Sequence, residues 1–135
     1  MTERFYFDTS IWLDFYEKRG ENGKAAFKLI AKIIKEDWII GYSDVNIREL
    51  KNLGYSQNQI NELFRIVKPD NIKRLHIYKE QIKQANKISK IKDVPRIDVL
   101  QAILSRDNDF QLISRDKHFE KLKNITHARI PEDFI

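Results

Sequence analysis

The sequence predicts an α/β sandwich built on a mainly parallel sheet, and two observations lead to this fold class. Short apolar runs alternate along the chain with longer segments in which apolar residues recur at helical spacing. The 135 residues are 41% hydrophobic and 33% charged, which suits one compact domain, residues 1–135. Strands that alternate with helices pair in parallel, because each helix carries the chain back across the sheet.

The expected strands are short apolar runs, and the expected helices are marked by spacing and caps. "FYF" is too short for a helix, whereas the apolar residues of 23–36 recur at i, i+3, i+4 and i+7. Ser56 and Gln59 form a capping-box pattern at a helix start, and Pro69 closes that helix. In chain order we expect a strand at 4–8, helices at 10–18 and 23–36, a strand at 38–42, and helices at 44–53 and 57–67.

The second half continues this alternation. We expect a strand within "NIKRLHIY" at 71–78, a lysine-rich helix ending near residue 90, a helix from after Pro95 to about Arg106, the strand "QLIS" at 111–114, and a short helix after Asp116. "NITHARI" at 124–130 is a candidate last strand. In a parallel sheet the strand C-termini share one edge, and ligands bind in the crevice beyond it. Functional residues are therefore expected at that edge.

The formal net charge is +5, and segment 68–92 carries the positive excess, with eight Lys or Arg residues and two acids. Such a segment suits contact with nucleic-acid phosphates, because Lys and Arg replace condensed counterions. Lys79, Lys83 and Lys87 recur every four residues, however, as on any solvated helix face. The spacing alone favours a solvated face, and RNA binding by these three lysines is kept as a candidate.

The residue types narrow the chemistry further. The absence of cysteine excludes disulfides and thiolate metal sites. His76, His118 and His127 lack the close spacing of a zinc motif, so any metal is expected to have oxygen ligands. No stretch resembles a targeting leader or a membrane span, which predicts a cytoplasmic protein without membrane contact.

Two acids directly follow predicted strands. Asp8 ends the first strand, and Asp116 follows "QLIS" after only Arg115. Because parallel strands end at the same edge, we expect Asp8 and Asp116 to lie close together. For one acid alone, a cap or a surface turn is the simpler interpretation.

Two further acids lie in predicted helices. Glu49 lies on an apolar stripe, four residues after Val45 and four before Leu53. A carboxylate buried there costs several kcal/mol unless it has a partner or takes up a proton. Asp98 lies in the first turn after Pro95, where the helix dipole also favours an acid, so it indicates no site by itself.

A divalent cation is the partner that suits all four acids. No cation in the predicted edge segments is dedicated to them, whereas one or two Mg²⁺ or Mn²⁺ ions prefer oxygen ligands. Two such ions about 4 Å apart activate water and stabilise the leaving oxygen during attack on a phosphodiester. We therefore expect Asp8, Glu49, Asp98 and Asp116 to be metal ligands and catalytic residues.

These segments resemble the PIN domain family, in particular its small VapC-like members. The resemblance rests on "FDTSIWLDF", "SDVNIREL", "RIDVLQAIL", "LISRDKHFEKL" and the closing "ARIPEDFI", which keep the four acids in family order. It implies a three-layer α/β/α sandwich with a central, mainly parallel sheet of four to five strands, and Mg²⁺- or Mn²⁺-dependent endoribonuclease activity. Members are often toxins of toxin–antitoxin pairs and commonly form homodimers, so RNA, a cognate antitoxin and a second copy are the expected partners.

The sequence departs from the family pattern near Asp98 and near Asp116, and also at the polar "RDND" turn before "QLIS". "DVLQAI" stands where "DALIAA" is more usual, which changes the packing near Asp98. His118 stands two residues after Asp116, where many relatives have a further acid, and this predicts a weaker metal position. Ser10 is a secondary candidate, since its hydroxyl either orients a ligand or water or simply caps a helix.

Other functions remain as alternatives. A PIN-like RNA-binding or scaffold protein would keep the fold without cleaving RNA, but the presence of all four acids argues against it. A haloacid-dehalogenase-like phosphatase requires a second Asp where this chain has Ser10. The acids and lysine of a response-regulator receiver are likewise not found in the required order.

Overall fold

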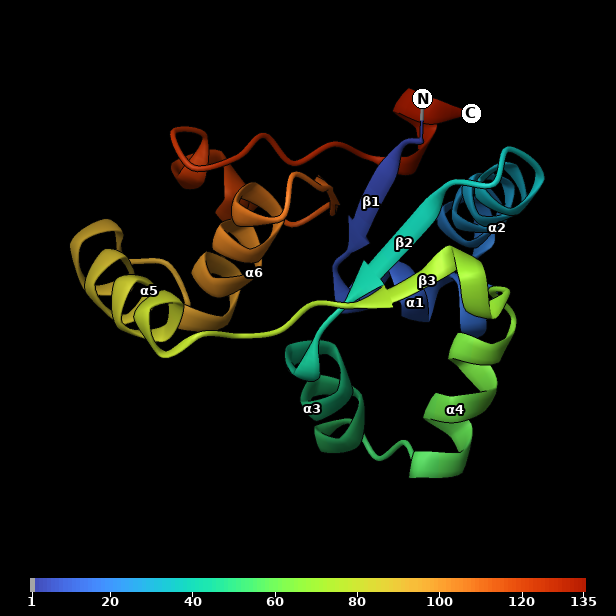
Figure 1. Ribbon diagram of the computed structural model, residues 1–135, viewed down its shortest axis with the longest axis horizontal. Helices are drawn as coiled ribbons and strands as arrows, with labels where there is room; N and C mark the ends of the chain where they lie inside the picture. Colours follow the sequence, from blue (N-terminus) through green and yellow to red (C-terminus); the bar gives the residue numbers. More distant parts are fainter. Residues whose placement is uncertain (1) are drawn as a thin grey trace.

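Four parallel strands form one sheet at the centre of the computed structural model, which describes residues 2–135 (Figure 1). The strands are β1 (Arg4–Phe7), β2 (Ile39–Tyr42), β3 (Ile72–Arg74) and β4 (Gln111–Ile113), in the spatial order β3-β2-β1-β4. All three pairings are parallel, which confirms the predicted sheet. The C-terminal ends of the two central strands and β4 therefore lie at one edge.

Helices cover both faces of the sheet and give three layers. Phe5 and Phe7 of β1 pack on one face, and Tyr6 packs on the other, as expected for alternating side chains in a buried strand. The helices of the first face are α1 (Thr9–Tyr16), α2 (Gly20–Lys35) and α4 (Gln57–Arg65). The helices of the second face are α5 (Lys79–Lys92) and α6 (Arg96–Asp107), with α6 between α5 and the strands (Figure 1).

Helix α3 (Asp44–Asn52) lies across the end of the sheet. Its Leu50 packs in the core of the first face and its Val45 in the core of the second. Ser43 begins the helix, because its side chain accepts a hydrogen bond from the amide of Val45 while Asn46 caps the amide of Ser43. This position brings Glu49 to the edge where the strands end.

Three segments differ from the expectations. The strand expected at 71–78 spans only 72–74. The amide of Leu75 still donates to the carbonyl of Tyr42 in β2, and the Leu75 side chain packs in the core of the second face. The last strand expected at 124–130 is wrong: the amides of Ile125 and Thr126 close a turn onto Leu122, and only a single bridge joins Arg129 to Ile113. The helix after Asp116 is of the 3₁₀ type.

Short 3₁₀ helices complete the chain, at Pro69–Asn71, Lys117–Leu122 and Pro131–Phe134.

Across residues 2–135, no helix has both the length and the hydrophobicity that a membrane crossing requires.

Candidate active site

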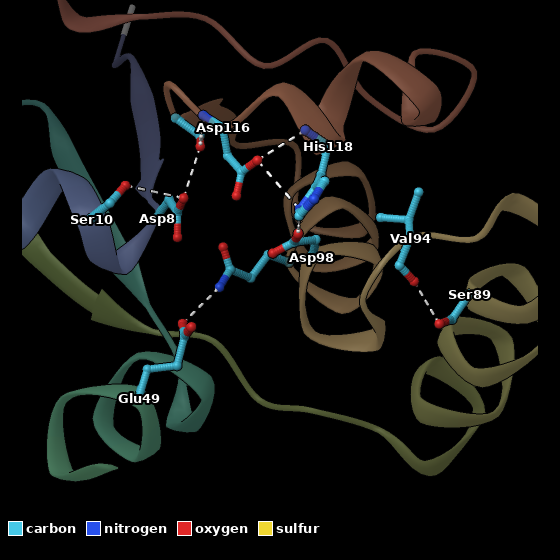
Figure 2. A network of polar contacts seen from close by, with 10 residues as sticks. Asp8, Ser10, Glu49, Ser89, Val94, Asp98, Asp116 and His118 are labelled. Atoms are coloured by element: carbon cyan, nitrogen blue, oxygen red, sulfur yellow. Dashed lines mark hydrogen bonds and ion pairs between the residues drawn. The ribbon is translucent and has the colours of Figure 1, made fainter. Parts of the chain in front are cut away.

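Asp8 directly follows β1 and is almost completely buried. Its backbone amide donates to the carbonyl of Ile113, so pairing with β4 continues to this residue. Two hydroxyls hold the carboxylate. Ser114 donates to Oδ2 at 2.8 Å. Ser10 donates to the same atom at 3.2 Å (Figure 2). The other oxygen, Oδ1, accepts no side-chain hydrogen bond from the described residues.

Asp116 lies at the end of the neighbouring strand, as its position after "QLIS" predicts. Ser114 connects it to Asp8, because the Ser114 hydroxyl that donates to Asp8 also accepts from the Asp116 amide at 3.0 Å. Asp116 caps the 3₁₀ helix at 117–122 through Oδ1, which accepts from the His118 amide at 2.9 Å. These contacts fix Asp116 beside Asp8 at the sheet edge.

Glu49 reaches the same edge from α3 and is half-buried. Its Oε1 accepts from the Thr9 hydroxyl at 2.7 Å and from the Gln101 amide at 3.1 Å. Thr9 is in turn held by the amide of Asn46 at 3.0 Å, and Asn46 also donates to the carbonyl of Phe7 at 3.2 Å. Both bonds use Oε1, so Oε2 of Glu49 has no hydrogen-bond partner within the described chain.

Asp98 lies in the first turn of α6 and is also half-buried. Its Oδ2 lies 2.7 Å from Nδ1 of His118, which in turn lies 3.3 Å from Oδ1 of Asp116 (Figure 2). His118 therefore lies between Asp98 and Asp116.

The acids interact electrostatically. Burial raises the pKa of Asp8, Glu49 and Asp98 above the ordinary values. Like-charged neighbours raise each pKa further: Asp116 acts on Asp8, Asp8 and Asp98 act on Glu49, and Asp116 and Asp8 act on Asp98. The hydrogen bonds from Ser114, Thr9 and His118 oppose these shifts by stabilising the charged form.

No Lys or Arg pairs with any of these four acids in the part of the chain that the structure describes. Arg115 is adjacent to Asp116 in sequence but turns away, toward Glu132 at 2.7 Å and the buried Asp14 at 3.9 Å. The cluster is therefore acidic, with His118 as its only ring nitrogen among residues 2–135.

Three residues at this edge were not identified as site residues from the sequence. His118 was seen only as a departure from the family pattern, yet Asp98, Asp116 and His118 each offer a ligand atom within 4.8 Å of the others. A ring nitrogen is therefore within reach of the same cation position as the carboxylate oxygens, whereas the sequence predicted oxygen ligands alone. Asn46 and Gln101 support Glu49, and the only signal for Gln101 was a polar residue three positions after Asp98 in an apolar helix.

The donor set fits a divalent cation. Carboxylate oxygens from β1, α3, α6 and the segment after β4 approach one another without a lysine or arginine. In addition, Oε1 of Gln101 is buried without a hydrogen-bond partner, although buried carbonyl groups normally have one. An arrangement of acids with an unsatisfied neutral oxygen beside them is chemically suited to Mg²⁺ or Mn²⁺.

The lysines at 79, 83 and 87 are exposed on α5, on the far side of α6 from the sheet. Lys83 lies 3.6 Å from Glu80 on the same exposed face. Their position is that of a solvated helix face, and a role in RNA binding stays a proposal.

Sheet, flanking helices and acidic edge together define a PIN-like α/β domain. The sequence matches the PIN domain family over residues 5–125, and the chain belongs to this family. A comparison with curated proteins found no match. Members of the PIN family are nucleases that generally depend on divalent metal ions.

Two solved structures have the same fold. One is the crystal structure of VapBC2 from Rickettsia felis bound to a DNA fragment from its promoter, with a TM-score of 0.69 and 12% identity over 94% of this chain and 98% of that chain. The other is FitAcB from Neisseria gonorrhoeae, with a TM-score of 0.60 and 16% identity over 95% of this chain and 98% of that chain. At these identities the likeness concerns the fold.

Proposed function

We propose that the chain is a Mg²⁺- or Mn²⁺-dependent endoribonuclease in which Asp8, Glu49, Asp98 and Asp116 hold the metal ions. The observation that carries the proposal is the crowding of these carboxylates. Three of them have a raised pKa, because each is buried near other acids, and none has a Lys or Arg partner among the described residues. A divalent cation relieves this repulsion, and membership of a nuclease family supports the same function.

Asp8, Glu49, Asp98 and Asp116 would hold the metal ions, which would supply activation of water and stabilisation of the leaving oxygen of the phosphodiester. The residues of the chain position the ligands for this chemistry. Ser10 and Ser114 occupy one oxygen of Asp8 and leave the other for a cation. Thr9 and Gln101 do the same at Glu49. In this mechanism no side chain acts as the nucleophile, and the products carry 5′-phosphate and 3′-hydroxyl ends.

We also propose a path for the RNA backbone along α5 and the start of α6. A surface pocket of about 590 Å³ lies there, lined by Asn86, Ser89, Lys90, Pro95, Arg96 and Ile97. Arg96 is two residues before Asp98, and neither Lys90 nor Arg96 forms an ion pair with another described residue. Two basic side chains in one pocket suit backbone phosphates, and Lys79, Lys83 and Lys87 extend the positive surface along α5.

The test is Mn²⁺-dependent cleavage of a generic single-stranded RNA. The wild-type protein should cut it, whereas Asp8→Asn should not, and Asp70→Asn serves as a matched control at an exposed acid away from the site. Cleavage that survives in Asp8→Asn indicates a contaminating nuclease. RNA binding without Mn²⁺-dependent cleavage would support the alternative, a PIN-like RNA-binding or scaffold protein.

The biological role that we propose is that of the toxin of a toxin–antitoxin pair. Two of the structures with the same fold are named VapBC2 and FitAcB, and the first is bound to promoter DNA. A groove of about 710 Å³ on the first face of this chain is lined by Phe15, Tyr16, Lys18, Gly20, Gly23, Lys24, Phe27, Lys28 and Ile66. Its apolar floor and three lysines suit an amphipathic, acidic segment of an antitoxin.

The toxin role can be tested by identifying the genes adjacent to the gene for this chain. We expect a small open reading frame for a DNA-binding protein immediately upstream, and its product should copurify with this chain after coexpression. An isolated gene would contradict the toxin role but not the nuclease activity. Homodimer formation and a cytoplasmic location are part of the same proposal, and light scattering of the purified chain tests the first.

A further inference from the structure

His118 is held in a defined position between two acids. Asp116 caps the 3₁₀ helix that begins at Lys117, and its Oδ1 accepts from the His118 amide at 2.9 Å. The next residue, Phe119, is buried in the second core and anchors this turn. The backbone on both sides of His118 is therefore fixed, and its ring faces Asp98 from the opposite element.

The donor atoms of this group have the spacing of metal ligands. Nδ1 of His118 lies 2.7 Å from Oδ2 of Asp98 and 3.3 Å from Oδ1 of Asp116. Adjacent ligands of an octahedral cation, each about 2.1 Å from it, lie about 3 Å apart. The three side chains therefore need only small shifts to share one cation.

A second, independent observation points to a ligand at the same acidic edge, beside Glu49. Gln101 lies one turn after Asp98 on α6 and is fully buried, with Nε2 bonded to Glu49 and Oε1 without a partner. A buried carbonyl oxygen without a hydrogen bond lowers the free energy of unfolding, because its lost contact with water is not replaced. Oε1 of Gln101 is therefore an oxygen among these acids that a cation or a proton donor would satisfy.

We propose that Asp98, Asp116 and His118 form a mixed nitrogen–oxygen site that binds Mn²⁺ in preference to Mg²⁺, with Nδ1 of His118 as a direct ligand. Mg²⁺ is a hard cation that favours oxygen ligands and water. Mn²⁺ also favours oxygen ligands, but as a first-row transition ion it accepts an imidazole nitrogen more readily than Mg²⁺ does. Replacement of an oxygen ligand by imidazole therefore weakens Mg²⁺ binding more than Mn²⁺ binding. The inference rests on the metal site of the proposed function and assigns the metal preference to one residue.

Electron paramagnetic resonance on the purified full chain tests the assignment. With Mn²⁺ added, pulsed spectra of the wild-type protein should show coupling to a directly bound imidazole nitrogen. His118→Asp, which offers an oxygen ligand instead, should lose this coupling. Competition between Mn²⁺ and Mg²⁺, followed by the free Mn²⁺ signal, should show that the Mn²⁺/Mg²⁺ affinity ratio of His118→Asp is at least tenfold lower than that of the wild type. Loss of a residue that only hydrogen-bonds a metal ligand already costs about tenfold or more in metal affinity.

His127→Asp is the matched control, because it makes the same change at an exposed histidine outside the group. It should leave the nitrogen coupling and the affinity ratio unchanged. Bound Mn²⁺ without nitrogen coupling in the wild-type protein would overturn the inference even if His118→Asp failed to fold. In that case, RNA cleavage that still requires Mn²⁺ would leave the proposed function standing, whereas absence of any Mn²⁺ binding would overturn both.

Discussion

The Gln101 amide donates a 3.1 Å hydrogen bond to Oε1 of Glu49, and this bond joins α6 to α3 across the end of the sheet. The same oxygen accepts from Thr9, which follows Asp8 in the chain. Glu49 is thus oriented from two sides, by the helix that carries Asp98 and by the segment that carries Asp8. Acids from separate elements are held in one arrangement because neutral donors connect them.

Gln101→Leu should weaken metal binding while the fold persists. The substitution removes one of the two donors to Glu49, and loss of a residue that hydrogen-bonds a metal ligand typically costs 10–100-fold in affinity. Stability should change little, because an apolar side chain of similar size also removes the unsatisfied Oε1. Calorimetric titration with Mn²⁺ and thermal unfolding check both points. Gln111→Leu, at the opposite end of β4, is the control and should leave Mn²⁺ affinity unchanged.

Asp8→Asn should abolish cleavage and yet leave the metal-free protein at least as stable as the wild type. Removing one charge from the crowded acids relieves repulsion, and an amide oxygen still accepts from Ser10 and Ser114. We expect a gain of about 1 kcal/mol in the free energy of unfolding, or about 3–5 °C in Tm. Thermal unfolding in EDTA measures this. An unfolded Asp8→Asn variant would mean that Asp8 is a structural acid.

Without metal, the acids should make stability fall as the pH rises. A carboxyl with a raised pKa binds its proton more tightly in the folded state, so its stabilising contribution is complete below the unfolded value and is lost on ionisation. The loss should begin above the ordinary values of 3.8 for Asp8 and Asp98 and 4.5 for Glu49. Urea unfolding in EDTA across this range checks the sign, and Mn²⁺ should reverse the trend because it binds the ionised form. A flat profile for these groups would contradict the crowding.

Charge reversal at Lys90 and Arg96 should weaken RNA binding without affecting metal binding. For each phosphate that the protein no longer neutralises, the slope of log affinity against log salt should become shallower by roughly 0.7 for a single strand. Fluorescence anisotropy with a labelled RNA and Asp8→Asn as the background measures binding without cleavage. Charge reversal at Lys28 and Lys35 on α2, on the other face of the sheet, is the control. Equal losses of affinity in both pairs would indicate nonspecific attraction rather than a path along α5.

The two acids that follow strands could be predicted from the sequence, because parallel strands end at the same edge of the sheet. A carboxylate after β1 and one after β4 therefore lie at one edge, independent of the conformation of the loops. Glu49 was found for a different reason, as a charge on an apolar helix face. Gln101 and His118 gave no comparable signal, since their importance depends on distances between α6, α3 and the turn after β4. The strand expected at 124–130 is absent because Ile125 and Thr126 turn back onto Leu122, so that only Arg129 pairs with β4, as a single bridge.

The central claim is that acids from four elements share divalent cations, and a crystal soaked in Mn²⁺ tests it most directly. Anomalous scattering should locate manganese at the C-terminal edge of the sheet, within about 2.0–2.4 Å of oxygens from at least three of Asp8, Glu49, Asp98 and Asp116. Manganese bound elsewhere, or an edge without manganese in which lysines or arginines have turned in to neutralise these acids, would contradict the account.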